Sequence, residues 1–397
     1  MFSERFYPHG GGAELATWLY SKLLAEEGFK ITVVTTQFPG EAQEELLCNG
    51  LRIYRLPTHF MLDNRYFTLA NVGVLATSFI NNLIAQSDVV YVPCGWYSAI
   101  LAAKWHSKPV VVHMHNYSVA CPTSLMFDFD AQKVKPSTLK SYVLHEIIER
   151  NREPLSVAAS CIMNEVAGKF YYHMATYGDL LVFVSKAQMD LVLSTVPNLK
   201  SKSCMIYNPI PDFPFVKAEK SGVGYFGGKD FIKGYHVFIK ALNALRPQSG
   251  VTSYLSMTSK KQRKTRLNNG TVLNFLPRLS QAKLCSLMKK LSVVAVPSLC
   301  PEPSPYSLVQ SMIQGKLVIA SDIGGMPEIL KGETSGVKLT QPGDYKDIAE
   351  TLDCFLSLTL DEANEIGLKN RQFILNRFNN HRTVSSFVKV LEKVRAL

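Results

Sequence analysis

The sequence predicts an α/β protein with two domains, each a parallel sheet with helices on both faces. Short apolar runs alternate with helical patterns along the chain, which is typical of strand–helix–strand units. The chain has 397 residues, more than a single hydrophobic core normally spans. A proline-rich segment, residues 206–214, separates two halves that show the same alternation. We therefore expect the interdomain linker at this segment.

Several apolar runs in the first half have the length of buried strands. These runs are Lys30–Thr36, Leu51–Leu56, Asp88–Val92, Pro109–His113 and Leu180–Ser185. Residues 137–177 form a long helical stretch, and Arg371–Val394 at the end of the chain has the apolar periodicity of one helix. Both stretches have the apolar spacing that a helix needs to cover a sheet.

A glycine-rich loop near the start of the chain, Phe6–Glu14, leads into a helical pattern. Glycines allow a tight turn and a close approach of the backbone to a ligand, so Gly11 and Gly12 are candidate ligand contacts. Only Met1–Glu4 precede this loop. We therefore expect either a start codon assigned too late or a first sheet without its central strand, which would leave an unfilled slot and exposed edges.

The segment from Val296 to Glu328 carries the strongest functional signal. An apolar run ends at Pro297, a loop follows, and residues 306–314 read as a helix with a glycine just past its end. The N-terminus of a helix offers N–H groups and a positive dipole end to a phosphate or diphosphate. The candidate donors in its first turn are the N–H groups of Tyr306, Ser307 and Leu308.

Two polar side chains flank this helix start. Glu302 precedes the helix and Gln310 lies inside it, so that one ligand could contact both. A second glycine turn follows the apolar run at residues 223–226. There, Gly227 and Gly228 allow the backbone to approach a diphosphate, and Lys229 and Lys233 are candidate cations to neutralise it. Lys233 is the stronger candidate of the two lysines, since Lys229 reads equally well as a solvated surface residue.

A histidine stands at the end of another predicted strand. His115 follows the run Pro109–His113, and ligands in open α/β sheets bind beyond the carboxyl ends of the strands. His115 is therefore a candidate catalytic residue. His113 should alternate to the other side of the sheet and serve packing.

Taken together, these motifs resemble those of the retaining glycosyltransferase family 4, also called glycosyl transferases group 1. Its members have the GT-B fold, in which two Rossmann-like domains face each other across a cleft. Residues 315–320 (GKLVIA) and 324–328 (GGMPE) match a strand and a turn of the family motif, and Glu302 matches its first glutamate. Gln310 stands in place of the second glutamate, and Gly228 stands in place of an arginine.

The resemblance implies that the chain is divided into three parts. They are an N-terminal Rossmann-like acceptor-side domain (1–207), a C-terminal Rossmann-like nucleotide-sugar-binding domain (208–375) and a final helix (376–397) that crosses back to the first domain. It also implies that Glu302 contacts the donor sugar and that Gln310, still able to hydrogen-bond, contacts the ribose. The glycine turns and lysines would hold the diphosphate, and His115 the sugar or the incoming acceptor.

The implied reaction moves a sugar from a nucleotide-diphosphate sugar to an acceptor hydroxyl with retention, and needs no metal and no cofactor. The implied acceptor is a glycan, a lipid-linked oligosaccharide, a glycolipid or a small molecule. Lys233, aided by Lys229 and the helix N–H groups, would stabilise the leaving diphosphate.

Composition narrows the setting. No apolar run approaches the ~20 residues that span a bilayer, and the start lacks the order of a signal peptide. The eight cysteines show no C-x-x-C pair, which favours reduced thiols in a cytoplasmic enzyme. The resemblance adds a peripheral contact with the cytoplasmic face of a membrane to the expected partners.

The net charge of +11 lies in residues 206–397, which suits a domain that binds an anionic nucleotide. Part of this charge is the run Lys260–Arg266, which reads as an exposed loop or helix end with a solvated face. No aromatic residues interleave with it and no nucleic-acid motif occurs, so nucleic acid is not an expected partner.

Three alternatives stay open at this level. A nucleotide-sugar 2-epimerase shares the architecture, although the Glu302 loop fits the transferases better. A nicotinamide dehydrogenase would need a G-x-G-x-x-G turn that the first glycine loop lacks. A degenerate transferase-like binding or assembly module would explain why Gly228 and Gln310 depart from the motif.

Overall fold

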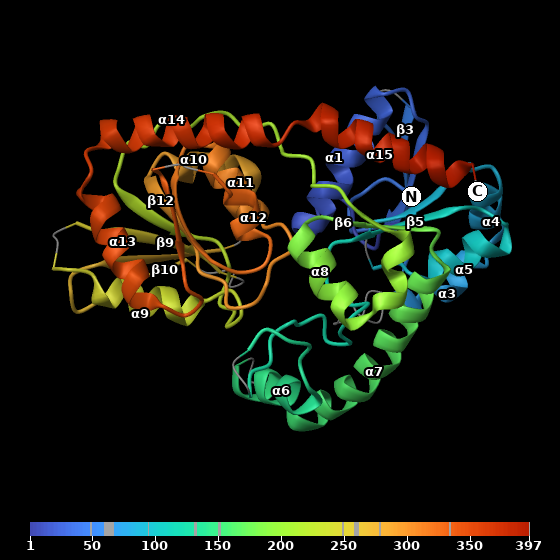
Figure 1. Cartoon of the computed structure of the whole chain (residues 1–397), viewed down its shortest axis with the longest axis horizontal. Helices are drawn as coiled ribbons and strands as arrows, with labels where there is room; N and C mark the ends of the chain where they lie inside the picture. The colour runs from blue at the N-terminus through green and yellow to red at the C-terminus, as the bar shows by residue number, and fades with distance from the viewer. Residues whose placement is uncertain are drawn as a thin grey trace. The chain divides into compact units, whose positions relative to one another are not determined.

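The computed structural model describes residues 1–47, 50–58, 67–93, 95–130, 133–149, 152–247, 250–257, 262–277, 279–332 and 335–396. They form two compact units (Figure 1). Unit 1 contains Met1–Ile210 and Asn379–Leu397, and unit 2 contains Pro211–Phe378.

Unit 1 is built on parallel strands. β4, β5, β6 and β7 pair in that order, β1 pairs with β3 in parallel, and β2 joins β3 as an antiparallel edge strand. The strands are β1 (Ile31–Thr36), β2 (Glu44–Leu46), β3 (Leu51–Leu56), β4 (Val90–Val92), β5 (Val110–Met114), β6 (Leu180–Phe183) and β7 (Ser203–Met205). The five strands predicted from the apolar runs are all present.

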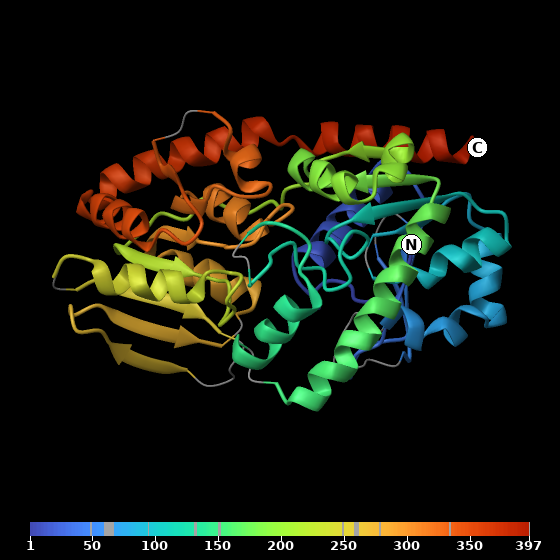
Figure 2. The same cartoon turned by 60° about the horizontal axis from the view of Figure 1, so that its bottom comes forward.

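Helices cover these two groups of strands. They are α1 (Gly12–Glu26), α2 (Phe67–Ala70), α3 (Val72–Leu75), α4 (Ser78–Ala85), α5 (Ser98–Trp105), α6 (Leu139–Leu144), the π-helical turn η3 (His145–Glu149), α7 (Pro154–Tyr177), α8 (Lys186–Thr195), the 3₁₀ turn η4 (Pro197–Lys202) and α15 (Asn380–Arg395). Figures 1 and 2 show α7 running from the sheet out to α6. The predicted helical stretch 137–177 is thus two helices joined through η3.

The slot expected in the first sheet is partly filled. The N–H of Phe2 donates to the carbonyl of Tyr91 in β4 at 2.9 Å, and the N–H of Ser3 donates to Val34 in β1 at 3.1 Å. Residues at the chain start therefore bridge β1 and β4 in place of a full strand, and the expectation of an unfilled slot is corrected. A cavity of about 690 Å³ remains beside them, lined largely by apolar side chains that include Leu24, Phe29, Ile31, Leu391 and Phe387.

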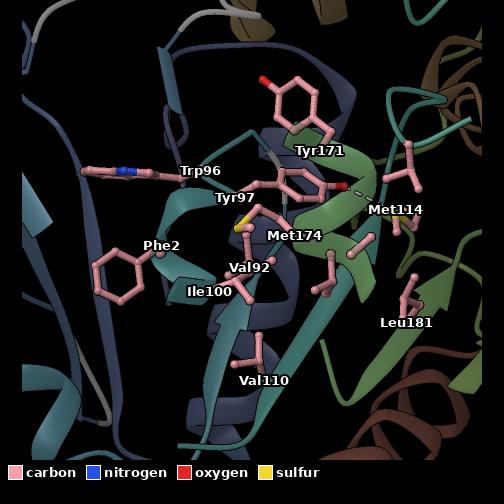
Figure 3. Close-up of a cluster of buried hydrophobic side chains, with 14 of the residues drawn as sticks. Phe2, Val92, Trp96, Tyr97, Ile100, Val110, Met114, Tyr171, Met174 and Leu181 are labelled. Carbon is pink, nitrogen blue, oxygen red and sulfur yellow. Dashed lines mark hydrogen bonds between the residues drawn. The ribbon is translucent and has the colours of Figure 1, made fainter. Parts of the chain in front are cut away.

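The face of the sheet under α5 and α7 carries the larger core of unit 1. Figure 3 shows Tyr97 pointing toward Met114, with its hydroxyl 3.2 Å from the Met114 sulfur, and Tyr171 beside the Tyr97 ring. The ring of Phe2 meets Trp96 edge-on, with ring centroids 5.8 Å apart. The short first segment is thus also fixed by its side chain.

The opposite face packs against α1 and α15. The ring of Phe387 lies 4.8 Å from Tyr20 of α1 and 5.1 Å from Tyr91 of β4. The prediction that the last helix returns to the first domain is confirmed, because α15 belongs to unit 1. The prediction of one continuous helix over Arg371–Val394 is wrong, since the Asn379 side chain caps a new helix by accepting from the N–H of Arg382.

Unit 2 contains one seven-stranded sheet in the order β10-β11-β9-β8-β12-β13-β14. Its elements are β8 (Gly222–Tyr225), α9 (Tyr235–Ala244), β9 (Thr252–Ser256), β10 (Arg263–Arg266), β11 (Val272–Leu276), α10 (Gln281–Met288), β12 (Leu291–Val296), α11 (Tyr306–Ile313), β13 (Leu317–Ser321), α12 (Met326–Leu330), β14 (Val337–Thr340), α13 (Tyr345–Ser357) and α14 (Leu360–Arg377). All strands pair in parallel except β10, which is antiparallel to β11.

This sheet corrects the prediction that the basic run Lys260–Arg266 is an exposed loop or helix end. Its described part, Arg263–Arg266, is the edge strand β10, not a loop or helix end, while Lys260 and Lys261 lie outside the described residues. Exposed positive charges on an edge strand discourage pairing with a second chain. Within the described ranges, no helix is both long and apolar enough to cross a bilayer.

Candidate active site

The centre of the site in unit 2 is an ion pair. The Lys233 ammonium, in the loop between β8 and α9, lies 2.7 Å from a carboxylate oxygen of Glu302, which follows β12. The Ser298 hydroxyl donates to the other carboxylate oxygen. Burial by itself would lower the pKa of Lys233, but the charge of Glu302 and its hydrogen bond raise that pKa overall. Lys233 therefore stays a cation.

A glycine turn holds Glu302 in place. Gly324 adopts a φ of +62°, and a Cβ atom there would lie 2.7 Å from both the backbone nitrogen and oxygen of Glu302. The N–H of Gly325 donates to the Glu302 carbonyl at 2.8 Å. The G-G-M-P-E turn thus positions the Glu302 loop, and glycine is required because the two backbones nearly touch.

The glycine turn after β8 approaches its surroundings closely at Gly227 and not at Gly228. A Cβ atom on Gly227 would lie 2.4 Å from the Tyr225 hydroxyl, whereas a Cβ atom on Gly228 meets nothing within 4 Å. Gly228 still has a φ of +72°, which favours glycine. Lys229 is exposed, and no ion pair holds it within the described part of the chain.

The helix α11 presents its first turn in the same unit. It begins at Tyr306 after Pro305, and no side chain caps its start. The N–H of Leu308 donates to the Pro305 carbonyl at 3.2 Å, so this predicted donor is engaged inside the helix. Ser307 keeps the geometry of a first-turn donor, because such N–H groups have no carbonyl four residues before them in the helix. Gln310 is buried, with 7% of its surface exposed.

The second group of candidate residues lies in unit 1, around His115. Its Nδ1 is 2.7 Å from the Pro93 carbonyl oxygen, and its Nε2 is 3.3 Å from Oδ1 of Asn208. Burial lowers the pKa of His115, while these two hydrogen bonds and the charge of Glu14 oppose that shift. Asn208 and Glu14 were not predicted as site residues.

His113 is buried and bonds the Tyr91 hydroxyl through Nδ1 at 2.8 Å, as a packing residue would. The two histidine rings do not lie on opposite sides of the sheet, because their centroids are 4.5 Å apart. The prediction that they lie on opposite sides is wrong, because residues two positions apart along an extended strand point to the same face. Burial, followed by the proximity of His115, lowers the pKa of His113 well below its usual value.

The first glycine loop is used to start α1. The N–H of Gly11 donates to the Glu14 carboxylate at 2.6 Å, and Gly12 is the first residue of the helix. A predicted ligand contact, the Gly11 N–H, is therefore engaged by a cap. A glutamate three residues after a helix cap is the sequence signal that would have found Glu14.

No cluster of three or more histidine, cysteine, aspartate or glutamate side chains suited to a metal ion occurs among the residues that the structure describes. The candidate groups are thus the ion pair with its glycine turns and helix start in unit 2, and the His115 centre in unit 1. A cation, a carboxylate and helix N–H groups at the carboxyl ends of β8 and β12 are suited to a charged, sugar-bearing diphosphate.

Comparison with known families agrees with this chemistry. The model of Glycosyltransferase Family 4 matches residues 10–212, more than half of the chain, and that of Glycosyl transferases group 1 matches residues 220–357. The chain belongs to glycosyltransferase family 4. It is a glycosyltransferase of the type that uses nucleotide sugars.

Relatives and solved structures agree on the fold. An "uncharacterized 42.6 kDa protein in cps region" of Klebsiella pneumoniae is 20% identical over 82% of this chain and 85% of its own length. Anabaena Alr3699/HepE, solved with UDP-glucose, is similar with a TM-score of 0.68 and 17% identity over 99% of this chain and 98% of that one. Sucrose-phosphate synthase from Thermosynechococcus elongatus has a TM-score of 0.67 and 15% identity over 98% and 94%. The predicted GT-B fold is confirmed.

Proposed function

We propose that the protein is a retaining, metal-independent glycosyltransferase that moves a sugar from a nucleotide-diphosphate sugar to an acceptor hydroxyl. The proposed acceptor is a glycan, a glycolipid, a lipid-linked oligosaccharide or a small molecule. We place this activity in the cytoplasm, with a peripheral membrane contact when the acceptor is lipid-linked. Co-sedimentation with vesicles that contain such an acceptor would test that contact.

In unit 2, we assign the diphosphate to Lys233, the glycine turn at Gly227 and Gly228, and the start of α11. The positive charge of Lys233 stabilises the negative charge that develops on the leaving diphosphate. Fixed charges lower the activation barrier most when they face such a developing charge. Glu302 takes hydroxyl groups of the donor sugar, and Gln310 takes a ribose hydroxyl as a neutral donor and acceptor.

In unit 1, we assign His115 to the sugar or to the incoming acceptor hydroxyl. A neutral imidazole whose Nδ1 donates to a carbonyl keeps an accepting Nε2 for a hydroxyl proton. The glycine loop at Gly11 and Gly12 is assigned to the phosphates, with Gly12 the better N–H donor, because Gly11 already donates to Glu14.

The observation that carries the proposal is the Lys233–Glu302 pair, held at 2.7 Å beside a glycine turn and a helix start. The first experiment measures binding and slow hydrolysis of a panel of nucleotide-diphosphate sugars by the wild type, with EDTA present. UDP-glucose heads the panel, since HepE was solved with it. Lys233→Ala should lose hydrolysis by about 100-fold or more, while Lys229→Ala, an exposed lysine in the same loop, should lose far less.

A donor that binds and is hydrolysed only when Lys233 is present supports the transferase and names its sugar. The anomeric configuration of a transferred product, read by NMR, then decides retention. Hydrolysis that requires a divalent metal contradicts the metal-independent mechanism.

A second candidate is favoured by two residues. Gly228 replaces the arginine of the family motif and Gln310 replaces its second glutamate, which together remove charge from the proposed donor site. A degenerate module that binds or assembles without catalysis would show no donor hydrolysis and no transfer.

An epimerase would convert the donor sugar at C2 without releasing it, and NMR of the same panel would detect that product.

A further inference from the structure

We propose that Asn208 is a positioning residue for His115, whose side-chain amide holds Nε2 by donating to the neutral ring and accepting from the protonated ring. The inference deepens the proposed function, because it assigns a partner to the histidine of that function. Its first test reads the ring itself and does not depend on transferase activity.

Of the two ring nitrogens of His115, only Nε2 can bind a partner that is a donor in one state and an acceptor in the other. The Pro93 oxygen, 2.7 Å from Nδ1, is a carbonyl and can only accept, so Nδ1 carries a proton. Nε2 lies on the opposite edge of the ring, 3.3 Å from the Asn208 amide. A substrate hydroxyl therefore has to meet His115 at Nε2, where Asn208 already lies.

An amide suits this place because it offers both a donor and an acceptor. When the ring is neutral, Nε2 accepts, and the NH₂ group of Asn208 must face it. When the ring is protonated, Nε2–H donates to Oδ1, which is the orientation in this structure. A half-turn of the amide about its terminal torsion exchanges the two arrangements without moving the backbone.

The backbone on both sides of Asn208 is fixed. The Tyr20 hydroxyl donates to the Tyr207 carbonyl at 3.2 Å. The Asn380 side chain accepts from the N–H of Ile210 and donates to its carbonyl, both at 2.8 Å. Asn208 itself is 6% exposed. Because this backbone is anchored, the Asn208 amide can rotate about its terminal torsion and still lie beside Nε2.

The other groups near the ring set the balance between its two states. Glu14 of α1 contributes a negative charge that favours the protonated ring, whereas burial favours the neutral ring. His113 of β5 lies 4.5 Å away and is itself hydrogen-bonded to Tyr91 of β4. From α8, the neutral Gln188 donates to the carbonyls on either side of His115, those of Met114 and Asn116.

The test follows His115 and the Asn208 amide by ¹H–¹⁵N NMR across a pH titration of the full chain. In the wild type, the Asn208 NH₂ signals should shift with the same midpoint as the His115 ring. Asn208→Asp should raise the measured pKa of His115 by about one unit or more, because a carboxylate stabilises the protonated ring. Asn208→Leu, with no polar group at Nε2, should lower it.

The control is Asn81→Leu, since Asn81 bonds Nε2 of His106 at 2.7 Å elsewhere in unit 1. It should leave the titration of His115 unchanged. The proposal is overturned if the Asn208 amide does not follow His115 in the wild type, a measurement that needs no variant to fold. It is also overturned if folded Asn208→Asp titrates His115 as the wild type does.

Kinetics add a separate readout once a donor and acceptor are known. The acid limb of the kcat profile should move upward in pH with Asn208→Asp, and Asn208→Leu should lower kcat more than it changes KM. If the NMR shifts occur and the kcat profile stays unmoved, Asn208 still positions the ring, and it is the proposed catalytic role of His115 that fails.

Discussion

The ammonium of Lys233 lies 2.7 Å from a carboxylate oxygen of Glu302, so the cation assigned to the diphosphate and the carboxylate assigned to the sugar bind each other. A diphosphate that approaches Lys233 must compete with Glu302. The pair therefore links the two halves of the proposed donor, and a change at Glu302 should affect phosphate and sugar in opposite directions.

Glu302→Gln should tighten the binding of free UDP by about 3- to 10-fold, because the competing negative charge is removed from Lys233. The same variant should slow donor hydrolysis by about 100-fold, because the neutral amide holds the sugar less well. Calorimetry with UDP and initial rates measure the two effects. Glu219→Gln removes an exposed ion pair with Lys289 in the same unit and serves as the control. Weaker UDP binding in Glu302→Gln would contradict the competition.

Gly324→Ala should displace the Glu302 loop, because its Cβ would lie 2.7 Å from the Glu302 backbone. Gly343→Ala is a matched control, since Gly343 also has a positive φ, of +89°, but its Cβ would meet only a leucine side chain at 3.7 Å. Both variants should lose about 1 kcal/mol of stability from backbone strain. Only Gly324→Ala should also lose donor binding, measured by calorimetry, and equal donor affinities in the two variants would refute the steric argument.

Gln310 should distinguish ribose from 2′-deoxyribose if it contacts a ribose hydroxyl. The wild type should bind UDP more tightly than 2′-deoxy-UDP by about 5- to 10-fold, the value of one neutral hydrogen bond. Gln310→Leu keeps the size of this buried side chain and should bind both nucleotides equally. A preference for UDP that survives in Gln310→Leu would assign the ribose to another residue.

Because of Lys316, the free energy of unfolding should increase as the pH rises above 8. Its side chain is fully buried and donates to the Val216 carbonyl at 2.6 Å, and burial lowers its pKa from 10.5 to about 8. The unfolded chain binds the proton more tightly between these values, so the free energy of unfolding should rise by about 3 kcal/mol from pH 8 to pH 10.5. Below pH 8 this group adds no further slope.

Lys316→Met should remove that rise, which chemical denaturation at several pH values would measure. The variant also leaves the Val216 carbonyl without its partner, which offsets part of the gain expected at neutral pH. Lys290→Met, an exposed lysine of the same unit, should keep the wild-type slope. If Lys316→Met keeps it as well, the alkaline dependence arises elsewhere.

The structure decided several features that local pattern misjudged. The apolar periodicity of residues 371–394 continues through Phe378, yet the chain ends one helix and starts another there, because α14 packs in unit 2 and α15 in unit 1. The basic run became an edge strand because Arg263–Arg266 pairs with β11. A charge pattern shows exposure but cannot show which strand lies beside it.

The sequence by itself determined the class of the fold, the five strands expected in the first half, the Glu302 loop and the helix at Tyr306. Each of these depends on neighbours along the chain: apolar runs, glycine turns and helix ends. Only the tertiary structure decided that Lys233 pairs with Glu302, that Asn208 faces His115 and that Glu14 lies near it. These contacts join residues far apart in the chain, and a single sequence carries no record of which distant residues meet. The side chains meet because parallel strands bring their carboxyl ends to one edge of a sheet.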